Sequence, residues 1–195
     1  MINNDVIFGT IASDDFRINE RELTTRIGYP IVDNRDHINA LIELIKDNAS
    51  YKFAYVKIPL SINDTVCDLG FACVDSPSLC QVLCGCKEVI VLAVSTGVEV
   101  DRLISKFQVS NKADAYLCDA ISSALIESVA DYLCGILSNK MAITKRFSPG
   151  YADFPLEFQS QILDRLSSQS TVGISLTDSK MMIPTKSITA ILGVY

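Results

Sequence analysis

The chain has 195 residues, of which 49% are hydrophobic and 21% are charged, and it contains no Trp. A chain of this length forms one domain or one compact pair of lobes, and its hydrophobic content excludes an intrinsically disordered protein. The formal net charge of −6 argues against nucleic acid and anionic lipid as partners, because both are bound by basic surfaces.

The start of the chain and its cysteines favour the cytosol. Residues 1–5 lack the positively charged segment of a secretory signal, and the apolar stretch 6–8 is too short for its hydrophobic segment. The longest uninterrupted apolar run, residues 89–94, is far shorter than the ~20 residues of a membrane span, so we expect no membrane contact. We therefore expect a cytoplasmic protein whose seven cysteines are free thiols.

The first part of the chain, residues 1–75, is predicted to mix helices and strands. Asn19 precedes Glu22 by three residues, which is the spacing of a capping box at the start of a helix. Gly28 and Pro30 stand where a glycine and a proline commonly follow a helix end. We predict one short helix between Asn19 and Gly28.

A second helix and a strand complete this part. Residues 51–58 are rich in aromatic and β-branched types and predict a strand that Pro59 ends, whereas residues 65–74 are a weaker strand candidate. The helix precedes them and is indicated by four apolar residues at i, i+3, i+4 and i+7: Ile38, Leu41, Ile42 and Ile45.

The second part, residues 76–195, belongs to the same single domain and is predicted more clearly. Ser76 followed by Pro77 is typical of a helix start. Residues 89–94 predict a strand that is buried on both faces, because the run is apolar without alternation. Two helices flank this strand, and their apolar faces are Leu79, Val82, Leu83 and Cys86 before it and Val100, Leu103, Ile104 and Phe107 after it.

The remaining elements favour an α+β fold. The longest helix is predicted over residues 112–137, and a break over 138–150 follows it. Pro155 opens another amphipathic helix, and residues 172–176 and 188–194 are predicted to be strands. Helices and strands alternate irregularly, so we predict an α+β arrangement and not a doubly wound parallel sheet.

Several motifs of catalysis and cofactor binding are absent from the sequence. No Gly-rich loop ends in Gly-Lys-Ser/Thr and no Gly-x-Gly-x-x-Gly follows the buried strand, which argues against a P-loop and a nicotinamide cofactor. His37 is the only histidine, so the His-Glu-x-x-His zinc hydrolases are excluded and a triad would depend on this one residue. We interpret His37 as a polar surface residue and predict no catalytic residue.

Three closely spaced cysteines, Cys80, Cys84 and Cys86, are dense enough to raise the possibility of soft-metal binding. Their spacing is not the Cys-x2-Cys pair of a structural zinc site, and no second pair lies at a matching distance. Because a free cysteine is commonly a small buried hydrophobe, we predict core thiols and no metal site, with metal or redox chemistry as the alternative. Cys118 and Cys134 receive the same interpretation.

The most distinctive stretch of the sequence is residues 145–151, in which Arg146 precedes a Ser-Pro-Gly turn and an aromatic residue. Arg binds a carboxylate through two parallel hydrogen bonds, and Gly150 allows a ligand to approach the main chain closely. Tyr151 offers a flat face for an adenine ring or a sulfonium cation. These residues indicate a small-ligand site, and the alternative is an ordinary loop between helices with an Arg at its surface.

This stretch resembles a known signature. Arg146-x-x-x-Gly150-Tyr151 is similar to the S-adenosylmethionine-binding signature of the activation domain of cobalamin-dependent methionine synthase. Residues 173–184 resemble that family's Gly-x-x-Leu-Thr-Glu-Ser-x-Ala-Met-x-Pro segment, and residues 125–133 resemble its helix Leu-x-Glu-x-x-Ala-Glu-Tyr-Leu. The three segments occur in the family's order.

The resemblance covers roughly residues 86–194 and implies both a fold and a site. It implies an α+β domain in which a twisted, mainly antiparallel sheet is flanked by helices. In the family, the Arg and the turn hold the amino-acid end of S-adenosylmethionine, and a helix Glu belongs to the same site. The implied cofactor-binding residues are Arg146, Ser148, Gly150, Tyr151 and Glu127. The alternative, which spacing alone leaves open, is that Glu127 is a solvated acid on a helix flank.

The resemblance also implies a function that depends on a partner. The family's domain presents S-adenosylmethionine to an oxidised cobalamin while a flavodoxin- or ferredoxin-type donor supplies an electron, and methylation traps the reduced cofactor. This chain has no Asp-x-His-x-x-Gly cobalamin motif, so we expect the cobalamin to be carried by a separate methyltransferase on which the chain acts in trans.

Two departures from the family leave an alternative open. Residues 152–155 read Ala-Asp-Phe-Pro where the family's long form has Pro-Ala-Cys-Pro, and the sequence stops at Tyr195, before the long form's C-terminal extension. We therefore expect weaker binding or a different ligand. The alternative is a non-catalytic module that docks a corrinoid protein or binds a ligand without using S-adenosylmethionine.

Overall fold

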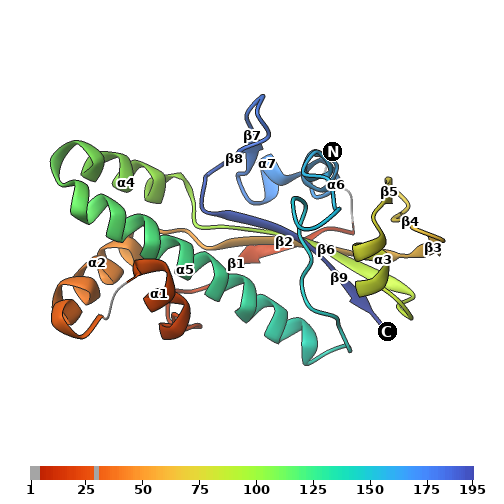
Figure 1. Ribbon diagram of the computed structural model, residues 1–195, viewed down its shortest axis with the longest axis horizontal. Coiled ribbons are helices and arrows are strands. Elements are labelled where there is room, and N and C mark those ends of the chain that lie inside the picture. The colour runs from red at the N-terminus through yellow and green to blue at the C-terminus, as the bar shows by residue number, and fades with distance from the viewer. Residues whose placement is uncertain (1–4, 29–30) are drawn as a thin grey trace.

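The computed structural model describes residues 5–28 and 31–195 and shows helices on both faces of an antiparallel sheet (Figure 1). The strands are β1 (Ile7–Thr10), β2 (Lys52–Pro59), β3 (Ser61–Asn63), β4 (Val66–Asp68), β5 (Cys73–Asp75), β6 (Glu88–Ser95), β7 (Ser175–Leu176), β8 (Met182–Ile183) and β9 (Ser187–Val194). The helices are α1 (Glu20–Ile27), α2 (Arg35–Asn48), α3 (Pro77–Val82), α4 (Val98–Ser110), α5 (Lys112–Ser138), α6 (Phe158–Arg165) and α7 (Ser168–Thr171), with a short 3-10 turn over Ile31–Asn34.

The main sheet has the order β1-β2-β6-β9, and every neighbouring pair is antiparallel. Tyr55 on β2 stands opposite Leu92 on β6, and Leu92 stands opposite Ala190 on β9. Two smaller antiparallel sheets, β3-β4-β5 and β7-β8, extend from this frame. The predicted α+β class with a mainly antiparallel sheet is confirmed.

Alternating side chains of β6 feed two separate apolar cores, as the unbroken apolar run predicts. Ile90 and Leu92 join a first core with the side chains of α1, α2, α4 and α5, and Val89 and Val91 join a second core with those of α3, α6 and the segment before β7. Figure 1 shows α1, α2, α4 and α5 together on one side of the sheet and α6 and α7 on the other. We refer to these two sides as the first and the second layer.

The start of α1 follows the sequence, with one difference. Asn19 caps α1 by accepting hydrogen bonds from the amides of Arg21 and Glu22, and Gly28 ends the helix in the left-handed conformation. The predicted capping box is only half formed. The amide of Asn19 donates to Ser128 Oγ on α5 and not to Glu22, whose carboxylate turns instead to Arg26 on the same helix. Pro30 lies outside the described residues.

The second layer departs most from the predicted elements. The weak strand candidate 65–74 is two short antiparallel strands, β4 and β5, with a turn between them. The helix expected from Pro155 starts three residues later at Phe158, and the strand expected over 172–176 is only the pair Ser175–Leu176. Strand β1, which pairs with the edge of β2, has no counterpart among the predicted elements.

Helix α5 passes the length and composition test for a membrane span, as the one such helix among residues 5–28 and 31–195. Within its most apolar window, 61% is buried inside the molecule, since α5 packs along the first layer. Core helices of globular proteins pass the same test, so this result is weak evidence for a span.

Candidate functional site

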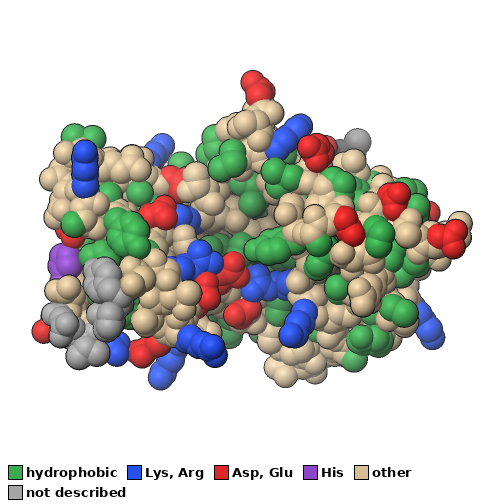
Figure 2. Space-filling view, viewed as in Figure 1, with side chains coloured by type: hydrophobic (Ala, Val, Ile, Leu, Met, Phe, Trp, Pro, Cys, Tyr) green, Lys and Arg blue, Asp and Glu red, His purple; other side chains and the backbone are tan. Residues whose placement is uncertain are grey.

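A cavity of about 620 Å³ opens between α5 and the segment that returns from it along β9. It is lined by acidic side chains of α5, by residues 144–149 and 151, and by the start of the β8–β9 region. In Figure 2 the centre of this face is hollowed, and Lys, Arg, Asp and Glu side chains gather there. The volume is within the ~300–1,000 Å³ of ordinary small-molecule sites.

The position of Arg146 follows from how the chain leaves α5. Residues 142–147 run antiparallel along the free edge of β9, with the amide of Thr144 bonded to Gly193 O at 3.0 Å and Phe147 and Ile191 exchanging both backbone hydrogen bonds. Successive residues of such an extended segment point to opposite sides. Phe147 therefore packs on the second core, while Arg146 turns toward α5.

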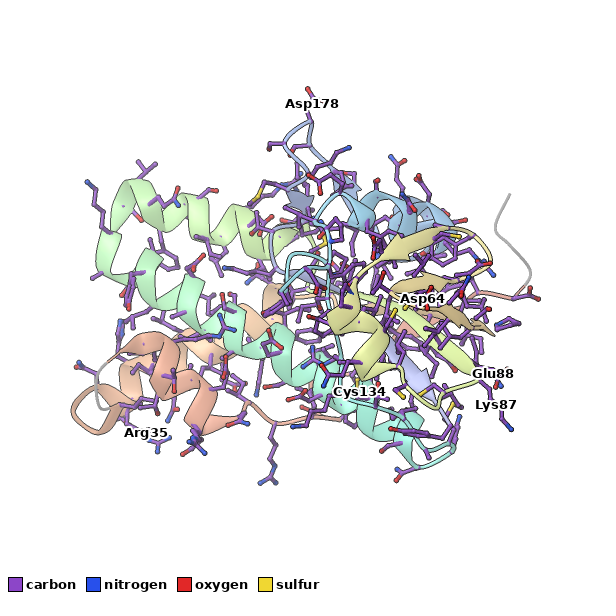
Figure 3. All side chains as sticks on the ribbon, turned by 45° about the vertical axis from the view of Figure 1, so that its right-hand side comes forward. Arg35, Asp64, Lys87, Glu88, Cys134 and Asp178 are labelled. Atoms are coloured by element: carbon purple, nitrogen blue, oxygen red, sulfur yellow. The ribbon has the colours of Figure 1, made fainter. Side chains whose placement is uncertain are left out.

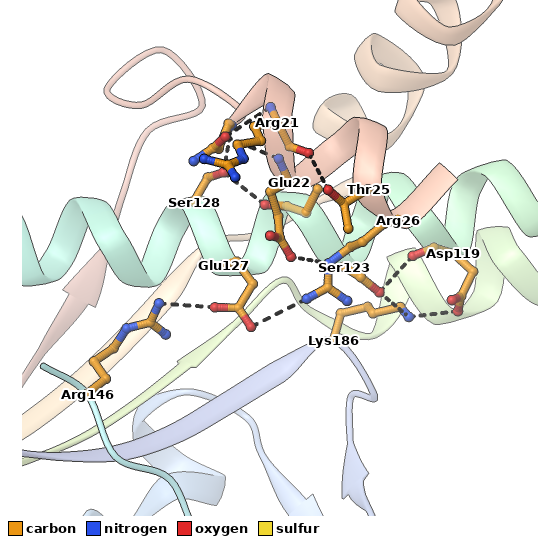
Figure 4. Close-up of polar contacts among 12 residues, drawn as sticks. Arg21, Glu22, Thr25, Arg26, Asp119, Ser123, Glu127, Ser128, Arg146 and Lys186 are labelled. Atoms are coloured by element: carbon orange, nitrogen blue, oxygen red, sulfur yellow. Dashed lines mark hydrogen bonds and ion pairs between the residues drawn. The ribbon is translucent and has the colours of Figure 1, made fainter. Parts of the chain in front are cut away.

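Arg146 is held by two carboxylates of α5. Its Nη2 lies 3.0 Å from Glu127 Oε2 and 2.6 Å from Asp131 Oδ1. Glu127 also approaches Arg26 Nη2 at 3.6 Å through its other oxygen, and Arg26 contacts Glu22 at 2.6 Å. Figure 4 shows this chain of alternating charges between α1, α5 and the returning segment. Both carboxylates contact the same guanidinium nitrogen, so neither makes the bidentate pair that Arg forms with a well-placed carboxylate.

The guanidinium remains charged although only 20% of the side chain is exposed. Burial by itself lowers the pKa of Arg146, and the carboxylates of Glu127 and Asp131 outweigh it, so the pKa lies above its ordinary value. The thiol of Cys134, a residue labelled in Figure 3, also lines the cavity. Burial raises the pKa of Cys134 to about 11, although Arg146 partly offsets that rise.

The turn after Arg146 brings the next predicted residues to the same place. Ser148 and Tyr151 line the cavity, and Tyr151 is 64% exposed at its rim. The amide of Tyr151 donates to Ser148 O at 3.2 Å, and that of Gly150 to Phe154 O at 2.8 Å. Gly150 has φ 90°, which favours glycine, but it is not a lining residue. Four of the five predicted site residues therefore line one cavity, and Gly150 shapes the turn.

Among the lining residues outside the prediction, and the ion-pair partners of Glu127 and Arg146, three bear on the charges of the site. Asp131 stands four residues after Glu127, so both share one face of α5, and that spacing was the signal available in the sequence. Cys134 lies one turn further along, and its position follows only from the way the segment after α5 folds back. Arg26 comes from α1, more than 100 residues away, and no local pattern indicates its contact with Glu127.

The cysteines and the single histidine lie apart from this arrangement, Cys134 excepted. Cys80 is buried, as predicted, with its Sγ 2.7 Å from Cys67 Sγ, whereas Cys84 is exposed, so the prediction of a core thiol is wrong at that position. Within residues 5–28 and 31–195, no three His, Cys, Asp or Glu side chains are placed to hold a metal ion. His37 is half exposed and its Nε2 lies 2.8 Å from Asp114 at the start of α5.

Comparison with solved structures finds the same fold in the crystal structure of the MetH reactivation domain bound to AdoHcy. The TM-score is 0.70 at 14% sequence identity, and the match covers 96% of this chain and 78% of that one. At this identity the similarity establishes the fold. No family model and no curated protein sequence matches the chain. The activation-domain fold implied by the sequence resemblance is thereby confirmed.

Proposed function

We propose that this chain binds S-adenosylmethionine and acts in trans as a reactivation module for a cobalamin-carrying methyltransferase, such as a cobalamin-dependent methionine synthase. The observation that carries the proposal is the position of Arg146. A charged, largely buried guanidinium stands in the wall of a cavity of suitable size, beside the Ser148–Tyr151 turn. The fold is that of a domain whose crystal structure holds AdoHcy, the demethylated product of this ligand.

The residues of the cavity match the chemistry of the ligand. The α-carboxylate of the methionine moiety would bind Arg146 bidentately and so displace Asp131, whose contact uses one nitrogen only. Glu127 keeps its contact with Arg26 and offers a carboxylate to the ammonium or the sulfonium. Tyr151 has an exposed ring on which an adenine could stack. The chain thus supplies binding and orientation and no acid–base chemistry.

In the proposed reaction the partner's cobalt(II) takes one electron from a flavodoxin- or ferredoxin-type donor. The reduced cobalt then forms a bond to the methyl carbon, the carbon–sulfonium bond breaks, and S-adenosylhomocysteine leaves. The ligand supplies the methyl group, and the role of this chain is to hold the methionine end in the cavity so that the sulfonium faces the partner.

Titration calorimetry with S-adenosylmethionine tests the binding step. We expect wild-type protein to bind with a dissociation constant in the micromolar to millimolar range, and Arg146→Ala to weaken binding by about tenfold or more, since a charge-assisted bidentate pair is lost. Arg102→Ala is the matched control, because Arg102 is an exposed Arg that pairs with Glu99 on α4 outside the cavity. Absence of binding at millimolar ligand, or equal affinities of Arg146→Ala and wild type, would contradict the proposal.

A second function is favoured by one observation, namely that Arg146 is already engaged by Glu127 and Asp131. If no ligand displaces these carboxylates, the chain is a non-catalytic module that docks a corrinoid protein. A reconstitution assay separates the two functions. In the proposed function, methyl transfer to the reduced cobalamin of the partner requires both this chain and S-adenosylmethionine. In the second, the chain binds the partner and no methyl group is transferred.

A further inference from the structure

The turn beside the cavity is tied to a distant part of the chain by one carboxylate. Asp153 accepts hydrogen bonds from the hydroxyl of Ser76, from the hydroxyl of Ser78 at 2.9 Å and from the amide of Ser78 at 3.2 Å. The two segments are 75 residues apart in sequence. Asp153, Ser76 and Ser78 do not line the cavity, so these hydrogen bonds lie outside the site described above.

The partners of Asp153 belong to a firm part of the second layer. Ser76 is fully buried and caps α3, because its hydroxyl oxygen accepts a hydrogen bond from the amide of Leu79 at 3.2 Å. Leu79 on α3 and Leu83, the residue that directly follows this helix, are fully buried in the second core. Helix α3 therefore provides a fixed support against which the turn is held.

The turn itself needs such support. Ala152, between Tyr151 and Asp153, has φ 50°, which is the left-handed region that is costly for a residue with a Cβ. On its far side Phe154 is buried in the second core, where its ring stacks on Phe147 at a centroid distance of 6.0 Å. Phe154 anchors the turn on its apolar side and Asp153 anchors it on its polar side. Tyr151 is 64% exposed, so the direction of its side chain follows from the turn that these two anchors hold.

We propose that Asp153 is a positioning residue of the ligand site: its hydrogen bonds to Ser76 and Ser78 hold the left-handed turn so that Tyr151 and Ser148 face the cavity. The inference rests on the proposed function, since it assigns Asp153 a part in ligand binding. The hydrogen bond from Ser76 lowers the pKa of Asp153, so the carboxylate stays charged at neutral pH and the tie weakens only as the pH falls through that lowered pKa.

The first experiment needs no ligand. Because the chain has no Trp, Tyr151→Trp gives a single fluorescent probe on the turn. In that background we expect Asp153→Ala to raise the acrylamide quenching constant and to lower the anisotropy of Trp emission. Asp47→Asn, on the exposed side of α2, is the control and should leave both unchanged. Unchanged quenching and anisotropy in Asp153→Ala would overturn the proposal.

The second experiment measures the effect on the ligand with Tyr151 restored. We expect Asp153→Ala and Ser78→Ala each to raise the dissociation constant for S-adenosylmethionine, Asp153→Ala by about tenfold, and the double variant to cost no more than Asp153→Ala alone. Asp153→Asn keeps one acceptor and the shape of the side chain, so it should fold as wild type and lose affinity by a smaller factor. Additive losses, or unaltered affinity in Asp153→Ala, would overturn the proposal.

The two experiments separate this inference from the proposed function. If wild type fails to bind S-adenosylmethionine but the probe at position 151 loosens in Asp153→Ala, the proposed function is wrong and Asp153 still orders the turn. If wild type binds and Asp153→Ala matches it in both measurements, the proposed function stands and the positioning role is wrong.

Discussion

The two layers that cover the sheet are built by different means. In the first layer, the 27-residue helix α5 supplies a continuous apolar side that includes the fully buried Ile121, Leu125 and Val129. In the second layer, α3 has six residues and α6 has eight, and short strands and turns connect them. Polar ties such as that of Asp153 to Ser78 fix their relative positions.

The cavity lies where these layers meet, and each layer contributes one wall. Glu127, Asp131 and Cys134 stand on the well-packed helix α5, whereas Arg146 and Tyr151 come from the segment that returns across β9 to the second layer. The two walls therefore differ in construction. One stands on a long packed helix, and the other on a turn held by the contacts of Asp153 and Phe154.

The largest effect is expected in the labelling rates of the cysteines, which should be much lower for the thiols on α5 than for the exposed thiols of the second layer. Burial raises the pKa of Cys134 to about 11, and burial and then Asp114 raise that of Cys118 to about 11, both on α5. The reactive species is the thiolate, so at pH 8 a thiol of pKa about 11 should react roughly a hundredfold more slowly than an ordinary thiol. We expect N-ethylmaleimide to label the exposed Cys73 and Cys84 first, as mass spectrometry of the native protein would show.

The pH dependence of the rate at which Cys134 is labelled provides a second test. Below its raised pKa, the thiolate fraction of Cys134 grows about tenfold per pH unit, so its labelling rate should keep rising above pH 9. Bound S-adenosylmethionine should protect Cys134, which lines the cavity, and leave Cys118 unaffected. Labelling of Cys134 as fast as Cys84 at pH 8 would show that the α5 wall opens readily, and the contrast between the walls would be lost.

The sequence predicts the first layer better than the second for the same physical reason. The apolar spacing in α2, α4 and α5 is repeated over several helical turns, and β6 has seven consecutive buried residues. Each of these elements is therefore indicated by many residues of its own sequence. In the second layer, β4 and β5 have three residues each, and Cys67 on β4 packs against Cys80 on α3, a contact that no local pattern contains. Strand β1 is also not predicted from the sequence. It has four residues at the edge of the sheet, and its apolar side chains Ile7 and Phe8 are half exposed, so its apolar pattern is weak.

Some residues of the site can be predicted from local sequence, and others are brought together only by the tertiary structure. Arg146, Ser148 and Tyr151 lie within six residues, so a contiguous signature was enough to group them. Glu127 came from a second segment of the family resemblance, and Asp131 shares its helix face. By contrast, the contact of Arg26 with Glu127 and the tie of Asp153 to Ser76 join segments far apart in sequence, and only the packing of the layers brings them together.

Substitutions of two glycines, one on β9 and one on α5, should change the free energy of unfolding in opposite directions. A Cβ at Gly193 on β9 would lie 2.4 Å from Cys86 Sγ, 3.0 Å from Thr144 Cγ2 and 3.1 Å from Leu83 Cδ2, so Gly193→Ala should destabilise the protein by about 2 kcal/mol through overpacking. Apart from the backbone of its own helix, no described atom lies within 4 Å of such a Cβ at Gly135 on α5, and Gly135→Ala should stabilise by about 0.5–1 kcal/mol because Ala is the better helix former. Urea unfolding measures both free energies.

The pair also bears on the cavity, because Thr144 lines it. Gly193→Ala should weaken S-adenosylmethionine binding as well as stability, while Gly135→Ala should change stability alone. Equal and small effects of the two substitutions would mean that the second layer yields to an added methyl group as easily as the surface of a helix does, and that the close approach at Gly193 does not constrain the returning segment.

The smallest effect, and the one most specific to the cavity, is expected from Asp131→Asn. Asp131 is 62% exposed, so its ion pair with Arg146 should contribute less than about 0.5 kcal/mol to the free energy of unfolding. The substitution removes the negative charge that competes for one N–H of Nη2, while Glu127 still contacts that nitrogen, and the dissociation constant for S-adenosylhomocysteine should fall by about threefold in calorimetry. S-adenosylmethionine should gain less, because its sulfonium also loses a nearby negative charge. Asp119→Asn is the control. Asp119 also lies on α5 and is similarly exposed, and it pairs with Lys186 outside the cavity. If both substitutions shift affinity equally, the effect is that of net charge; if only Asp131→Asn does, the carboxylate on the α5 wall competes directly with the ligand for Arg146.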